Sequence, residues 1–149
     1  MIRFVPLAAA LLAAQAVAAG PLEVTSRVFL QQQVAAPDGT MRVQLVPAAR
    51  VTPGDRLTVV VSYRNAGRQP IADLAIVDPV PAGLAYRGGE PGAPVPDVSV
   101  DGSRFGPLGG LAVAGRPAGP ADVTHVRWRV AGALAPGAGG RFAFQAVLK

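Results

Sequence analysis

The sequence predicts an all-β protein, an antiparallel β-sandwich of about seven or eight short strands. Three observations lead to this fold class. Apolar and polar residues alternate with a period of two in several runs, which places one face of each run on a core and the other in water. The 18 glycines and 15 prolines divide the chain at short intervals. No helical period of comparable strength follows the first twenty residues.

The N-terminus has the pattern of a secretory signal peptide over residues 1–19. Arg3 provides a positive start, Phe4–Ala14 is apolar, and Ala16-Val17-Ala18 or the neighbouring Val17-Ala18-Ala19 offers a small-residue cleavage site. A membrane anchor would need about 20 apolar residues, and Gln15 interrupts a shorter stretch. The sequence therefore predicts an exported protein, periplasmic or extracellular, with one domain over residues 20–149 and no transmembrane segment after cleavage.

The candidate strands follow one another closely along this domain. LTVVVSY, VTHVRWRV and RFAFQAVL alternate most regularly, and Trp128 on the second of these is the expected anchor of the core. Pro37-Asp38-Gly39-Thr40 predicts a tight turn between the first two strands. The expected strands are Glu23–Val34, Met41–Pro47, Arg56–Arg64, Ala72–Asp78, Ala85–Arg87, Val98–Val100, Val123–Val130 and Arg141–Leu148.

One region does not show the alternation of apolar and polar residues. Residues 88–123 are rich in Gly, Pro and Ala and are expected to form a long loop. A hairpin is predicted inside it, in which Val98–Val100 is followed by Asp101-Gly102 and the chain returns through Arg104–Gly106.

Several motifs in a fixed order give the chain a family likeness. Pro53-Gly54-Asp55 enters a strand that ends at Asn65-Ala66-Gly67, the next strand ends VDPVPAGL, and Trp128 precedes Leu134-Ala135-Pro136-Gly137. From about Val51 to Leu148 the chain resembles the bacterial conserved repeat domain, known as domain of unknown function number eleven. The resemblance implies an immunoglobulin-like sandwich and a place in cell-surface or secreted proteins. This chain holds a single copy and adds Leu22–Arg50, expected to be a hairpin that completes the sheet.

The motif residues have structural explanations that do not depend on the family. Asn65 and Gly67 suit a turn, because Asn bonds nearby backbone and Gly accepts a positive φ. Asp78 is expected to accept backbone N–H groups of the following turn. The structural motif comprises Asn65, Gly67, Asp78, Pro81, Gly83, Trp128, Pro136 and Gly137.

The composition leaves little material for catalysis, and we expect no enzyme. The chain has no Cys and one His, so we expect no metal site, no cofactor and no catalytic residue. The aspartates lie at turns or strand ends. A hydrolase that recruits His125 with Ser62 or Ser103 and Asp122 is the least favoured alternative.

The amount and distribution of charge limit the classes of partner that we expect. The net charge is +5, and the arginines are scattered without a basic run, so no nucleic acid is expected. His125, Arg127 and Arg129 form a row that could bind an anionic glycan or another envelope ligand, with a solvated sheet face as the plainer interpretation. Open sheet edges offer a route to a protein partner. The leading hypothesis is an exported, non-enzymatic structural or protein-interaction module of the bacterial cell envelope.

Overall fold

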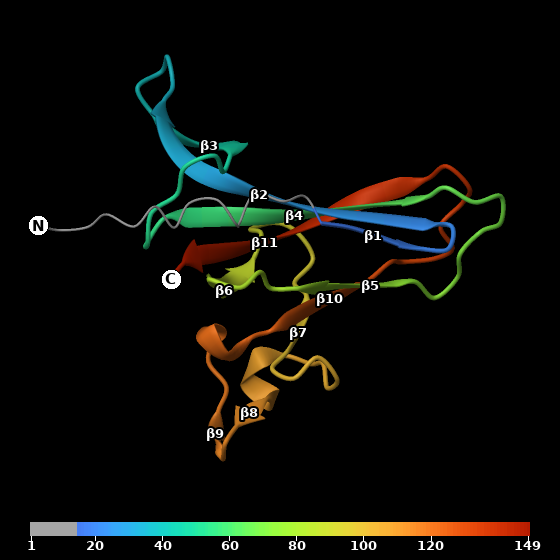
Figure 1. Ribbon diagram of the computed structural model, residues 1–149. Coiled ribbons are helices and arrows are strands. Elements are labelled where there is room, and N and C mark those ends of the chain that lie inside the picture. The colour runs from blue at the N-terminus through green and yellow to red at the C-terminus, as the bar shows by residue number, and fades with distance from the viewer. Residues whose placement is uncertain (1–14) are drawn as a thin grey trace, which may run out of the picture.

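Two antiparallel sheets pack face to face in the computed structural model, which describes residues 15–149 and their side chains from residue 20 onward (Figure 1). This confirms the predicted all-β sandwich. The predicted signal peptide lies mostly outside the described residues. The strands are β1 (Gln15–Ala19), β2 (Leu22–Ala35), β3 (Met41–Pro47), β4 (Arg56–Asn65), β5 (Ala75–Pro79), β6 (Leu84–Gly89), β7 (Asp97–Ser99), β8 (Ala112–Val113), β9 (Arg116–Pro117), β10 (His125–Arg129) and β11 (Gly139–Leu148).

The larger sheet has the order β1-β2-β4-β11-β6, and β3 also pairs with β2. β2 is the longest of these strands and pairs with three others. Its first part pairs with β4 on one side and with β1 on the other, and its second part pairs with β3. The β2–β3 hairpin confirms that Leu22–Arg50 completes the sheet. Its turn is as predicted: Asp38 accepts hydrogen bonds from the backbone N–H and the hydroxyl of Thr40.

The smaller sheet has the order β5-β10-β7 and covers the inner face of the larger one. The region predicted as a long loop, 88–123, contains β7, the short hairpin of β8 and β9, and two 3-10 turns. These elements form because Val98, Leu111 and Val123 are buried and tie the region to the core. The hairpin expected there is present, since Val98 and Gly106 exchange two backbone hydrogen bonds of 2.9 and 3.1 Å.

Aromatic side chains from both sheets fill the core. Trp128 on β10 is 3% exposed and stacks on Phe142 of β11, with ring centroids 5.0 Å apart. Phe142 in turn stacks on Tyr63 of β4 at 5.3 Å. The Trp128 indole N–H donates to the carbonyl of Pro94 at 3.3 Å. The prediction that Trp128 anchors the core is confirmed.

Asn65 joins two turns at one end of the sandwich. Its side chain is fully buried and donates to the carbonyls of Gln69 at 2.7 Å and Leu134 at 3.0 Å, while its Oδ1 accepts from the N–H of Gly67. The explanation given for Gly67 is wrong, because its φ is not positive. The residue is small for a different reason: a Cβ there would lie 2.5 Å from the Cβ of Pro21.

The remaining motif residues shape turns. Leu84 donates its backbone N–H to the carbonyl of Pro81, and Gly83 has a φ of +86°. Gly137, which follows Pro136, has a φ of +77° and donates its N–H to the carbonyl of Asn65. These glycines adopt a backbone conformation that other residues reach only with strain.

Candidate functional site: a groove at the open edge of the sandwich

A groove of about 250 Å³ opens between the two sheets where β2 and β5 approach each other. Side chains that alternate inward along β2 form one wall, and β5 forms the other. The lining is mainly apolar, with one hydroxyl and one carboxyl group among it. The residues are Leu22, Val24 and Ser26 on β2 and Ala75, Ile76, Val77, Asp78 and Pro79 on β5.

The carboxyl group in this groove belongs to Asp78, which is 7% exposed. Ser26 donates its hydroxyl to Asp78 Oδ1 at 2.5 Å, so the pair links the two sheets. The expectation that Asp78 accepts backbone N–H groups of the next turn is wrong, because its side chain points inward from β5 and meets β2 instead. Among the described residues, Asp78 Oδ2 is buried without a hydrogen-bond partner.

Burial raises the pKa of Asp78, because an ionised carboxylate loses its hydration there. The hydrogen bond from Ser26 and the charge of His125 lower the pKa and oppose this effect. A buried carboxyl with one unpartnered oxygen is costly to keep. Perturbed carboxyl groups are enriched at functional sites, and the groove beside Asp78 is therefore the candidate site.

The backbone of β5 leaves alternate peptide groups unpaired. Val80 donates its N–H to Thr124, and Val130 donates its N–H to Leu74, on either side of the β5–β10 ladder. Because hydrogen-bonded pairs alternate in an antiparallel ladder, Ile76 and Asp78 bond to β10. Ala75 and Val77 therefore direct their N–H and C=O groups away from β10, toward the open edge.

The other edge strand of this sheet is protected. Val98 on β7 bonds to Gly106 through both its N–H and its C=O. β5 has no such cover within residues 15–149, and of its last residues only Pro79 lacks the N–H that would face this edge. On the larger sheet, β1 lies along Leu22–Ser26 of β2. β1 falls within the predicted signal peptide, and a chain without residues 1–19 would expose the edge of β2 beside the same groove.

The row predicted to contact an anionic ligand lies on the outer face of β10. Arg127 is engaged within the fold: it donates to Asp97 at 3.1 Å, and its guanidinium lies 4.6 Å from the centre of the Phe105 ring. His125 Nδ1 lies 2.9 Å from the hydroxyl of Thr124. Arg129 is exposed. The structure therefore leaves Arg129 as the exposed residue of the three.

The aspartates considered for other chemistry form local structure. Asp101 accepts hydrogen bonds from the backbone of Arg104 and Ser103 and from the Ser99 hydroxyl, and these bonds lower its pKa. Asp122 pairs with Arg116 at 2.8 Å, and the hydrogen bond from that guanidinium is the main reason that its pKa falls to about 2. Turn and ion-pair roles account for both carboxylates.

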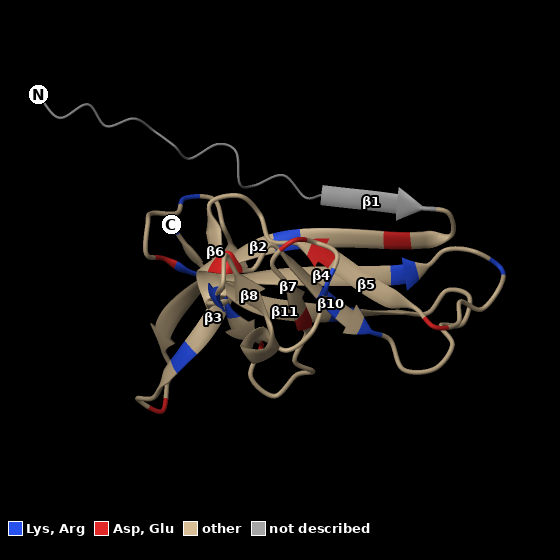
Figure 2. Cartoon of the chain, turned by 90° about the horizontal axis from the view of Figure 1, so that it is seen from below, with Lys and Arg blue, Asp and Glu red and all other residues tan. Residues whose placement is uncertain are grey.

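Neither a metal-binding cluster nor a spanning helix is found in the part of the chain that the structure describes. Within residues 15–149 no three His, Cys, Asp or Glu side chains come together as a metal site would require. The same residues contain no helix with the length and apolarity needed to cross a bilayer. Figure 2 shows basic and acidic residues interspersed over the strands, without a basic stripe.

Comparison with known proteins found no relative of this chain. No family model matches the chain, and no curated protein or solved structure matches it. The fold and the groove define the class as an all-β sandwich with an open edge. The resemblance to the conserved repeat domain stays a prediction from the motifs.

Proposed function

We propose that this chain is an exported, non-enzymatic protein-interaction module of the bacterial cell envelope, which binds an extended segment of another polypeptide. The observation that carries the proposal is the unpaired edge of β5 beside the groove between the sheets. A strand that adds to such an edge gains main-chain hydrogen bonds, and its side chains enter the neighbouring pockets.

The residues that line the groove indicate what kind of partner could bind there. Ala75 and Val77 supply the main-chain donors and acceptors, and Leu22, Val24 and Ile76 supply an apolar lining. The partner is therefore an extended segment with small apolar side chains at every second position. Removal of the signal peptide would leave the edge of β2 open as well, so that the incoming strand could lie between both sheets.

The proposal is tested by deleting one edge donor without breaking the sheet. Val77→Pro removes an N–H that faces away from β10, and proline is tolerated in edge strands when its nitrogen faces outward. Val77→Thr keeps the N–H and serves as the matched control. Each variant is tagged and expressed in the native host, so that it reaches the cell envelope, and it is then cross-linked and recovered. Its melting temperature is measured to verify folding.

We expect the original chain and Val77→Thr to recover the same dominant protein and Val77→Pro to lose it. Undiminished recovery by a folded Val77→Pro variant would show that the partner does not pair with this edge. Turnover of a substrate by the purified chain, abolished by His125→Ala, would favour the hydrolase alternative.

A further inference from the structure

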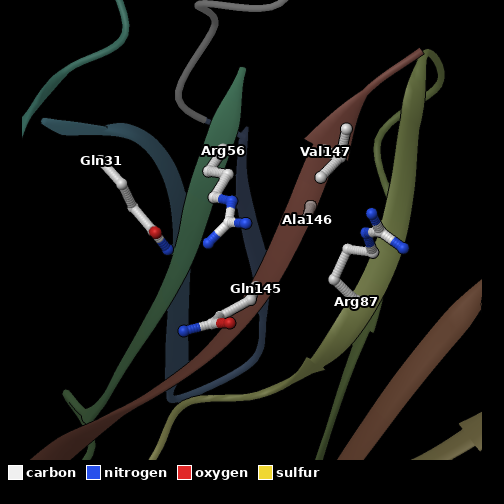
Figure 3. A pocket seen from close by; sticks show the side chains of 6 residues that line it. All are labelled: Gln31, Arg56, Arg87, Gln145, Ala146 and Val147. Carbon is white, nitrogen blue, oxygen red and sulfur yellow. The ribbon is translucent and has the colours of Figure 1, made fainter. Parts of the chain in front are cut away.

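A second hollow lies on the opposite side of the larger sheet, on the face that the smaller sheet does not cover (Figure 3). It measures about 230 Å³ and spans the neighbouring strands β2, β4, β11 and β6. Ala146 and Val147 line it, and because the Ala146 side chain is buried in the core, Val147 is the apolar side chain on this face. Two guanidinium groups and two carboxamide groups line it, and no carboxylate does. The polar residues are Gln31, Arg56, Arg87 and Gln145.

A β-bulge places one of the two arginines. The register between β11 and β6 shifts at Gln145/Ala146: Gln145 pairs with Gly88 and Ala146 pairs with Tyr86. Arg87 is the extra residue, and Gly88 next to it has a φ of +127°. Bulges redirect side chains and increase the local twist. Figure 3 shows Arg87, Gln145 and Arg56 on three adjacent strands with their side chains on the same side of the sheet.

Both arginines are free to bind a ligand. The ion pairs among the described residues involve other arginines, and neither Arg56 nor Arg87 takes part in one. Both side chains are exposed. Gln31 is held in place, because its amide donates to the buried hydroxyl of Thr58 at 2.9 Å. The hollow therefore presents several N–H donors and uncompensated positive charge.

We infer that this hollow is a binding site for an oxyanion, and specifically for the carboxylate of an acidic sugar in an envelope polysaccharide. Guanidinium groups bind carboxylates through paired hydrogen bonds. The carboxamides of Gln31 and Gln145 suit sugar hydroxyls, since each can both donate and accept. The Val147 side chain offers a sugar ring an apolar contact. This site is separate from the β5 edge and would tether the module to a surface while the edge holds its protein partner.

The test compares two pairs of arginines. Polygalacturonate, with one carboxylate on each sugar, is the probe, and neutral dextran is the control polymer. The double variant Arg56→Gln/Arg87→Gln removes two charges from the hollow. Arg68→Gln/Arg104→Gln removes two charges from exposed positions outside it. The affinity is measured at one fixed salt concentration, because charge-based binding depends on salt.

We expect Arg56→Gln/Arg87→Gln to lower the affinity for polygalacturonate by about tenfold or more per arginine, since each charged hydrogen-bonding pair lost contributes at least that factor. The control variant should stay within about twofold of the original chain. Arg56→Lys/Arg87→Lys keeps the charge but not the paired geometry, and it should also bind more weakly.

Two results would overturn the inference. Either the original chain does not bind polygalacturonate, or Arg56→Gln/Arg87→Gln and Arg68→Gln/Arg104→Gln lose affinity equally, which indicates net charge alone. In the first case, binding to vesicles of phosphatidylglycerol would assign the arginines to a lipid surface. Equal melting temperatures of the variants establish that folding does not cause the loss.

Discussion

Ser26 on β2 donates its hydroxyl to the buried carboxyl of Asp78 on β5, at 2.5 Å, and thereby joins the two sheets beside the open edge. This hydrogen bond contributes to the packing of the two sheets, and it lies beside the edge at which we propose that the partner binds. It holds β5 against the larger sheet while the edge of β5 stays unpaired. The first two predictions test the pair.

Asp78→Asn is expected to stabilise the protein in a pH-dependent way. Burial raises the pKa of Asp78 in the folded state above its ordinary value of 3.8. The folded protein therefore binds this proton more tightly than the unfolded chain, and stability is lost as the pH rises from 3.8 through the raised pKa. The amide does not titrate, so the variant should gain stability relative to the original chain at pH 7 and little at pH 3. Urea unfolding at both pH values measures this, and an equal difference at both would contradict it.

Ser26→Ala is expected to destabilise the protein. The substitution leaves Asp78 Oδ1 as well as Oδ2 without a partner, and an unsatisfied buried group costs roughly 1–3 kcal/mol. Ser62→Ala, at an exposed position of β4, is the matched control and should change the free energy of unfolding by less than about 0.5 kcal/mol. Equal effects of the two substitutions would show that the link between the sheets adds nothing to stability.

Asn65→Ala is expected to cost roughly 3 kcal/mol. The side chain makes three hydrogen bonds, to Gln69, Leu134 and Gly67, and its loss strands buried backbone groups in two turns at once. Asn65→Asp should be no milder, because it removes the amide donors and buries a charge. Thermal unfolding of both variants tests this, and a loss below about 1 kcal/mol for either would contradict it.

Export is expected to remove β1. Cleavage after Ala18 or Ala19 gives a mature chain that begins at Ala19 or Gly20. The mass of the protein recovered from the envelope identifies its first residue. A chain that keeps Gln15–Ala19 would retain β1 on β2, and the site would then be limited to the edge of β5.

Local patterns in the sequence were sufficient to predict most of the strands. Met41–Pro47 has the predicted bounds, and most of the others differ by one to three residues, because alternation and turn residues act over short distances. The missed strands β8 and β9 are two residues long, too short for alternation to register. β1 was missed because its residues read as part of a signal peptide.

The sites depended on contacts between distant residues and could not be predicted in the same way. Ser26 and Asp78 are 52 positions apart, and nothing near either residue indicates that they meet. Arg56 and Arg87 line the same hollow only because β11 brings β4 and β6 to its two sides. The bulge at Arg87 had one local signal, the Gly88-Gly89 pair, which sequence analysis treated as the start of a loop.

Residue-resolved amide hydrogen exchange tests the central claim most directly. It is measured on the processed chain alone and on its complex with the protein recovered from the envelope. In the free chain, the N–H groups of Ala75 and Val77 face the open edge and should exchange faster than those of Ile76 and Asp78, which bond to β10. In the complex, Ala75 and Val77 should become protected. Fast exchange at both residues in the complex, with new protection elsewhere, would contradict binding by strand addition to β5.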